Sequence, residues 1–349
     1  MSTAPATRVR LTDPSELIAA VPHLLGFHPR DSLVVISLDG RRLGMTLRAD
    51  LVDPEHRELL AEQLTAPLVH QRLTGVVLLV VGGVSGRSGG PGGDPGAGKL
   101  PHRCLVDTVD GVLAAEGIGV QHALWAASTS PGVPWCCYDE AGCAGTVGDP
   151  ATSPMAAATV AAGAVTFASR EELAGLLTPD PAEALARRGR LLAAADAEHP
   201  LDPATAALRV QRLGQLHAAA AGGALVLDDA GVVEVASALC DHRVRDGCLA
   251  WSVGAGGAAA EQLWLALVRA TPAPERAEPA ALLACTAYLR GDGALAGLAL
   301  EVALAACPEH ALAGLLRAAL DGGLPPDLLR SVARDAAAAA GAVLGFDEE

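Results

Sequence analysis

The hydrophobic pattern of the first 60 residues predicts a two-stranded antiparallel pair. The run Ser32 to Leu38 is apolar and β-branched, and Asp39-Gly40 behind it is a strong signal for a two-residue hairpin turn. In the return segment the residues alternate, with Leu43, Met45, Leu47 and Leu51 on one face and Gly44, Thr46, Arg48 and Asp50 on the other. One face of this hairpin is therefore expected to be buried.

Helices and further strands are predicted around this hairpin. Asp13-Pro14 has the composition of a helix start, and that helix is expected to end before Pro22. A second amphipathic helix is expected over 54–73, with Pro67 ending or kinking it near Ala66. Residues 75–81 are apolar throughout, as in a central strand covered on both faces, and a helix over 101–117 and a strand over 120–127 follow. This order predicts an α/β domain with a mixed sheet and at least one crossover connection.

From Ser153 onward the pattern changes to recurrent helix starts with few strand-like runs. We therefore expect two domains: an α/β domain over 1–165, with a Gly-rich loop over 82–98, and a mainly helical domain over 166–349.

One stretch of the helical region has the spacing of a tetratricopeptide unit, a helix pair that needs small residues where its helices touch. The unit covers about 278–312, with small residues at Ala284, Ala296 and Ala303 and a turn at Gly291-Asp292. The match is degenerate, because alanine or leucine stands at the aromatic positions. Two antiparallel Ala/Leu helices without a repeat function explain the same spacing.

Composition and charge exclude several classes of function. Hydrophobic residues make up 51% of the 349 residues and charged residues 19%, which is enough to bury a core and argues against wholesale disorder. The 25 Lys and Arg residues against 40 Asp and Glu give a net charge of −15, which argues against a nucleic-acid partner. No apolar run reaches the length of a membrane span and the first 11 residues lack an apolar signal core, so we expect a cytoplasmic protein without a membrane partner.

Three segments together carry a family resemblance. They are Asp13 to Val35, Leu47 to Leu51, and Tyr288 to Ala296 with the following Ala303 and Pro308. The chain resembles the actinobacterial domain-of-unknown-function family numbered 4192. The resemblance implies no activity. It does imply a Cys-rich, aromatic stretch after the last strand, which here runs from Trp135 to Cys143 and has Gly142 where a paired cysteine is expected.

Two motifs are weak candidates for a phosphate loop and a zinc site. The stretch from Gly93 to Lys99 fits the Gly and Lys spacing of a phosphate loop, but Leu100 lacks the hydroxyl that binds Mg²⁺ and Pro95 removes an amide donor. Five residues separate Cys137 from Cys143, and Cys136 and His122 lie upstream, but the second cysteine pair of a structural zinc site is missing. Free or transiently oxidised thiols explain this cluster better. We expect no metal and no cofactor.

The most polar group in the N-terminal segment offers one candidate ligand site. Its members are His28, Asp31, Arg48 and Asp50, the last two on the polar face of the return strand. A histidine, carboxylates and an arginine at a sheet end can bind an anionic ligand or transfer protons. The alternative is structural, with Asp31 capping a turn, Arg48 pairing with Asp31 or Asp50, and His28 on the rim.

Two functions follow from these observations. The first hypothesis is a non-catalytic interaction or regulatory protein with a protein partner, because the common catalytic motifs are missing and the helical region offers Ala/Leu helix pairs. The second is an enzyme or sensor that binds a small anionic ligand at the N-terminal polar group.

Overall fold

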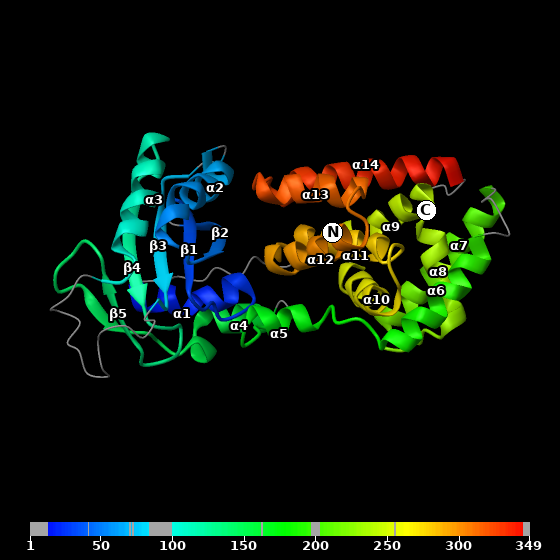
Figure 1. Cartoon of the computed structure of the whole chain (residues 1–349), viewed down its shortest axis with the longest axis horizontal. Helices are drawn as coiled ribbons and strands as arrows, with labels where there is room; N and C mark the ends of the chain where they lie inside the picture. The colour runs from blue at the N-terminus through cyan, green and yellow to red at the C-terminus, as the bar shows by residue number, and fades with distance from the viewer. Residues whose placement is uncertain are drawn as a thin grey trace. The chain divides into compact units, whose positions relative to one another are not determined.

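The computed structural model describes residues 13–40, 42–69, 71, 73–83, 100–161, 163–196, 203–254 and 256–344. The chain divides into two compact units, Met1–Leu173 and Ala174–Glu349. Figure 1 shows the strands in the first unit and helices throughout the second. An α/β N-terminal region with a mixed sheet, followed by a mainly helical region, is therefore confirmed.

The first unit is built on one six-stranded sheet with the order β2-β1-β3-β4-β5-β6. Its helices and strands are α1 (Pro14–Leu25), β1 (Ser32–Asp39), β2 (Arg42–Asp50), α2 (Arg57–Val69), β3 (Gly75–Val81), α3 (Arg103–Ala115), β4 (Val120–Ala126), β5 (Pro134–Cys137), β6 (Ala144–Thr146) and α4 (Pro154–Ala161). Among the strands that the structure describes, β3 and β4 pair in parallel and α3 lies between them in sequence; the other neighbouring strands are antiparallel. The predicted hairpin and the predicted crossover are both present.

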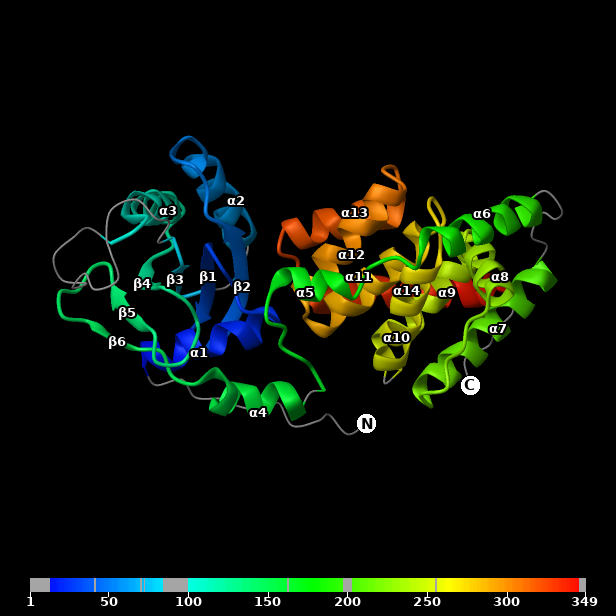
Figure 2. The same ribbon diagram turned by 60° about the horizontal axis from the view of Figure 1, so that its bottom comes forward.

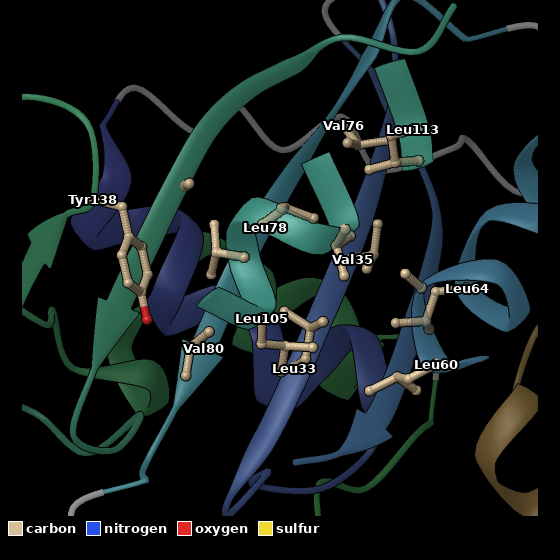
Figure 3. Packing of buried hydrophobic residues seen from close by; sticks show 14 of the residues in the cluster. Leu33, Val35, Leu60, Leu64, Val76, Leu78, Val80, Leu105, Leu113 and Tyr138 are labelled. Atoms are coloured by element: carbon tan, nitrogen blue, oxygen red, sulfur yellow. The ribbon is translucent and has the colours of Figure 1, made fainter. Parts of the chain in front are cut away.

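The core of this unit lies between the sheet and the helices α2 and α3 (Figure 3). Alternate residues of β1 and β3 contribute Leu33, Val35, Val76, Leu78 and Val80, which pack against leucines of the two helices. Figures 1 and 2 place α1 on the side away from α2 and α3. Because both faces are covered, every residue of β3 is buried, as its continuous apolar run predicts.

Proline was expected to end a helix at two positions, and neither helix ends there; the alternative of a kink at Pro67 stays a prediction. Helix α1 runs past Pro22 to Leu25 and ends at Gly26, whose φ of 78° closes the helix in the left-handed conformation. Helix α2 likewise continues past Pro67 to Val69. Both prolines are buried. Burial of the last apolar turn outweighs the one backbone hydrogen bond that each ring removes.

The strands β5 and β6 were not predicted. They are only four and three residues long, and the alternation of apolar and polar residues is too short there to be recognised.

The second unit is a bundle of helices around α11. After α5 (Arg170–Gly175), which spans the boundary, come α6 (Ala182–Asp196), α7 (Pro203–Ala221), α8 (Asp229–Leu239), α9 (His242–Val253), α10 (Gly257–Ala270), α11 (Ala277–Arg290), α12 (Gly293–Ala306), α13 (Ala311–Asp321) and α14 (Pro326–Leu344). Every residue of α11 from Ala277 to Leu289 is buried except Glu278. Helices α8, α9, α10, α12, α13 and α14 all contact it.

The pair α11 and α12 occupies the region of the predicted tetratricopeptide-like unit. The three small residues Ala284, Ala296 and Ala303 are 1% exposed or less, as expected where two helix backbones approach closely. Membership of the repeat family stays a prediction.

Candidate functional site

The carboxyl ends of β3 and β4 lie side by side, because the two strands are parallel neighbours. On its other side β3 pairs with the antiparallel β1, which therefore begins at this same edge of the sheet. In open α/β sheets ligands bind outside the carboxyl ends of the strands, at the point where the strand order reverses. The fold thus favours this edge as a binding site.

Four residues with positive φ meet at this edge, and we call them the edge cluster. Asp31 (φ 41°) and His102 (φ 57°) are the two non-glycine residues of this kind in the part of the chain that the structure describes, and Gly82 (84°) and Gly83 (78°) follow β3. Each such non-glycine conformation costs about 1–3 kcal/mol, and they are concentrated at functional sites.

The side chains of Asp31 and His102 both lie against the Gly82-Gly83 turn. Asp31 Oδ1 accepts a hydrogen bond from the Gly83 N–H at 2.8 Å. A Cβ placed on Gly82 would lie 2.6 Å from that same oxygen, and one on Gly83 would lie 2.5 Å from the His102 imidazole. Both positions therefore need glycine for space as well as for φ.

Hydrogen bonds from neighbouring strands fix the turn. The Gly82 N–H donates to the Ala126 carbonyl at the end of β4, at 2.9 Å, and the Trp125 indole donates to the Gly82 carbonyl at 3.0 Å. The Leu51 N–H donates to the Asp31 carbonyl at 2.9 Å. The edge cluster is consequently attached to three strands of the sheet.

His28 lies near the same edge and is neutral at pH 7. Its Nδ1 is 2.9 Å from the hydroxyl of Thr129, a buried residue just beyond β4. Burial lowers the pKa of His28, and the positive charges of His23 and Arg30 lower it further. Among the described residues no hydrogen-bond partner of Nε2 is seen, and the residue is half-buried.

Arg48 and Asp50 form a pair with each other. The Arg48 guanidinium donates to Asp50 Oδ1 at 2.5 Å and to the Ser32 hydroxyl at 2.8 Å, and it lies 6.0 Å from the centre of the Phe27 ring. Arg48 therefore stabilises the start of β1, with its Nε and Nη2 donors engaged within the chain. The structure brings all four predicted residues to one end of the sheet, but only His28 and Asp31 present free polar atoms toward the β3 and β4 edge.

This arrangement can recognise a small polar molecule. The Asp31 carboxylate is exposed and can accept hydrogen bonds beyond the one from Gly83. His102 stands at the start of α3 and its side chain does not cap the helix, whose first amides have no intrahelical acceptor. Carboxylate, imidazole and helix amides together can bind a donor group and an anionic group of one ligand.

A family model matches residues 14–327, and its description is "Domain of unknown function (DUF4192)". The chain belongs to the DUF4192 family. No curated protein and no solved structure matches the chain. The family description names no activity, so the function of this DUF4192 chain is inferred from its own site.

Sequence reasoning missed three members of the edge cluster of this DUF4192 chain. Gly82 and Gly83 directly follow an apolar strand and were assigned to the Gly-rich loop, and His102 lies 71 residues after Asp31. The Gly82-Gly83 pair after β3 was the available signal for this site, because glycine is commonly required where a ligand or another segment approaches the backbone closely.

The other sequence candidates in this DUF4192 chain do not form a metal or phosphate site in the described residues. The stretch Gly93 to Lys99 lies outside them. No group of three metal-binding side chains occurs in the ranges that the structure covers. Cys137 and Cys143 instead form a disulfide, while Cys136 points into the core.

Among these same ranges, none of the helices combines the length and the apolar character that crossing a bilayer requires.

Proposed function

We propose that this chain is a regulatory protein whose α/β unit binds a small anionic molecule at the edge cluster. The supporting observation is the meeting of Asp31 and His102, both at positive φ, on the Gly82-Gly83 turn beyond two parallel strands. Strained backbone of this kind persists only when the surrounding structure enforces it, and it is concentrated at active sites, ligand clamps and switch regions.

The chemistry of the site defines the ligand class. The Asp31 carboxylate only accepts hydrogen bonds, so the ligand needs a donor such as a hydroxyl or an amine. The start of α3 beside His102 favours a carboxylate or phosphate, because helix N-termini attract negative charge. A small hydroxy acid, amino acid or sugar phosphate meets both requirements.

A thermal-shift screen with such metabolites tests the proposal. A true ligand raises the melting temperature by an amount that grows with the logarithm of its concentration once that concentration exceeds Kd, by mass action. The shift is expected to disappear in Asp31→Asn and His102→Asn, since asparagine tolerates positive φ and removes only the charge or the ring. Asp53→Asn and His56→Asn are matched controls on exposed residues before α2 and should keep the shift. A shift that survives D31N and H102N places the ligand elsewhere.

Exposed apolar residues on the helical unit support a second role, binding of a protein partner. Leu315 on α13 is 70% exposed, and Leu328 and Val332, one turn apart on α14, are 57% and 62% exposed. Leu328 and Val332 form an exposed apolar pair on one helix face, and exposed apolar patches are typical of protein contact surfaces. We expect Leu328→Glu with Val332→Glu to abolish capture of a specific partner in a pull-down, and Leu208→Glu on α7 to leave it unchanged. If the double variant captures the same partner, this surface is not the contact.

A further inference from the structure

A disulfide closes the hairpin between β5 and β6. It joins Cys137, the last residue of β5, to Cys143, which directly precedes β6, with the two Cα atoms 5.5 Å apart. The Cys137 N–H donates to the Cys143 carbonyl at 2.8 Å. Gly142, with φ 88°, allows the turn, and the Cys143 N–H donates to the Glu140 carbonyl at 3.2 Å. The backbone therefore holds the two sulfurs in reach of each other.

Strand alternation selects Cys137 rather than Cys136 for this pair. Cys136 packs against the core with Tyr138, and burial raises the pKa of its thiol. Cys137 points to the opposite face, half-buried on a turn whose residues 139–142 are exposed. Cys137 and Cys143 are both partly exposed, and thiol–disulfide exchange requires such access for a small thiol or disulfide.

The remaining thiols of the described residues do not offer such a pair. Cys248 and Cys285 are buried in the helical unit, and burial raises the pKa of Cys285 to about 12, so that its thiolate is not formed near pH 7. Cys104 and Cys240 are exposed, and Cys307 is half-buried.

The residues that follow Cys137 hold the start of α3. The Tyr138 hydroxyl donates to the Pro101 carbonyl at 2.6 Å. Arg103 donates to the Tyr138 carbonyl and forms an ion pair with Asp139 at 3.0 Å. His102 lies between Pro101 and Arg103, so both neighbours of this histidine are attached to the hairpin.

We propose that Cys137 and Cys143 are a reversible dithiol–disulfide site that reacts with low-molecular-weight disulfides and, when oxidised, holds the first turn of α3 through Tyr138 and Arg103. This site is distinct from the edge cluster, and its test does not depend on a ligand there.

The exchange reaction balances without a metal or cofactor. The thiolate of Cys137 or Cys143 attacks a small disulfide R–S–S–R, forming a mixed disulfide and releasing one R–SH after protonation. The other thiolate attacks the protein sulfur of the mixed disulfide and releases the second R–SH. Two electrons pass from the protein thiols to R–S–S–R, the two thiol protons end on the released thiols, and excess R–SH reverses both steps.

The site is tested by redox titration of the full chain in mixtures of reduced and oxidised glutathione. Exchange is quenched by acid, free thiols are alkylated, and the modified cysteines are assigned by peptide mass spectrometry. We use Cys104→Ser with Cys240→Ser as background, which removes these exposed thiols. Loss of alkylation at Cys137 and Cys143 together, restored by excess reduced glutathione, is the expected result. Equal alkylation of both residues across the whole series, or a bridge through Cys136, overturns the proposal.

The connection to α3 is tested by amide hydrogen exchange of the same samples. Reduction is expected to speed exchange several-fold over residues 102–106 and to leave the buried strand β3 unchanged. The double variant Cys137→Ser with Cys143→Ser should show the exchange rate of the reduced wild-type protein under both conditions. A folding defect in the variant would instead speed exchange in β3 as well. If the disulfide forms reversibly but exchange in residues 102–106 is the same in both states, the part of the proposal that concerns α3 is overturned.

Discussion

The carboxylate of Asp31 accepts a hydrogen bond from the backbone of Gly83, 52 residues further along the chain. This bond connects the start of β1 to the turn after β3, and it lies where the imidazole of His102 approaches the same turn. A candidate binding site is thus formed by backbone geometry as much as by side-chain chemistry, and its glycines are open to direct test.

Gly83→Ala should destabilise the protein more than Gly117→Ala does. Both glycines have similar φ, 78° and 75°, but only the Cβ at Gly83 would meet His102, at 2.5 Å. A left-handed conformation with a side chain costs about 1–2 kcal/mol, and we expect Gly83→Ala to lose at least about 1 kcal/mol more. Urea unfolding followed by circular dichroism measures the difference. Equal losses for the two variants would mean that His102 moves away at no cost.

His28 should make the protein less stable as the pH falls. Burial holds its folded-state pKa below 6.5, the value of the unfolded chain, so the unfolded state binds more protons between the two values. The contribution is fully present above pH 6.5 and is lost as the pH falls through the lowered pKa. Urea unfolding between pH 7.5 and 5.0 should therefore show a smaller slope in His28→Gln than in wild type. The exposed His56→Gln is the control, and a slope unchanged in H28Q contradicts the assignment.

Ala296→Leu should destabilise the helical unit. Ala296 is fully buried where α12 meets α11, and no space remains for three further carbon atoms. Overpacking of a close-packed core costs about 1–3 kcal/mol. Ala318→Leu on the exposed side of α13 adds the same atoms and should change stability by less than about 0.5 kcal/mol. Similar small effects in both variants would show that α11 and α12 are less tightly packed.

Tyr288→Phe should weaken the attachment of the turn after α13. The Tyr288 hydroxyl lies 3.0 Å from the Ala319 carbonyl and 2.8 Å from the Leu324 carbonyl. Removing the hydroxyl takes one donor from both carbonyls, of which Ala319 keeps the hydrogen bond from the Leu324 N–H at 3.0 Å. We expect this loss to cost about 1 kcal/mol in thermal or urea unfolding. Hydrogen exchange should increase mainly over residues 319–324. An effect spread evenly over the whole unit would contradict a local role.

Local patterns were sufficient to predict most of the first unit. Three local signals predicted the observed β1–β2 hairpin and β3: the Asp39-Gly40 turn, the alternation after it and the apolar run of β3. Each of these signals depends only on residues that are neighbours in sequence. Proline was misinterpreted at Pro22 and Pro67 because burial, which depends on distant residues, outweighs the local loss of one hydrogen bond.

The candidate site could be predicted only in part for the same reason. His28 and Asp31 were found because they stand close together in a polar segment, but His102 joins them only through the order of the strands. Arg48 and Asp50 have the right composition for an anion site, yet they neutralise each other. Which polar groups remain free depends on pairing in three dimensions, and residue types alone do not determine it.

The burial of α11 has a consequence for how the helical unit can meet another molecule. In a stack of repeats each helix pair leaves one side open for the next pair, and peptides bind along the concave surface that results. Here six helices contact α11, and its surface is already used within the unit. A protein partner would therefore bind to the outer helices. Adding copies of the α11 and α12 pair could not lengthen the bundle.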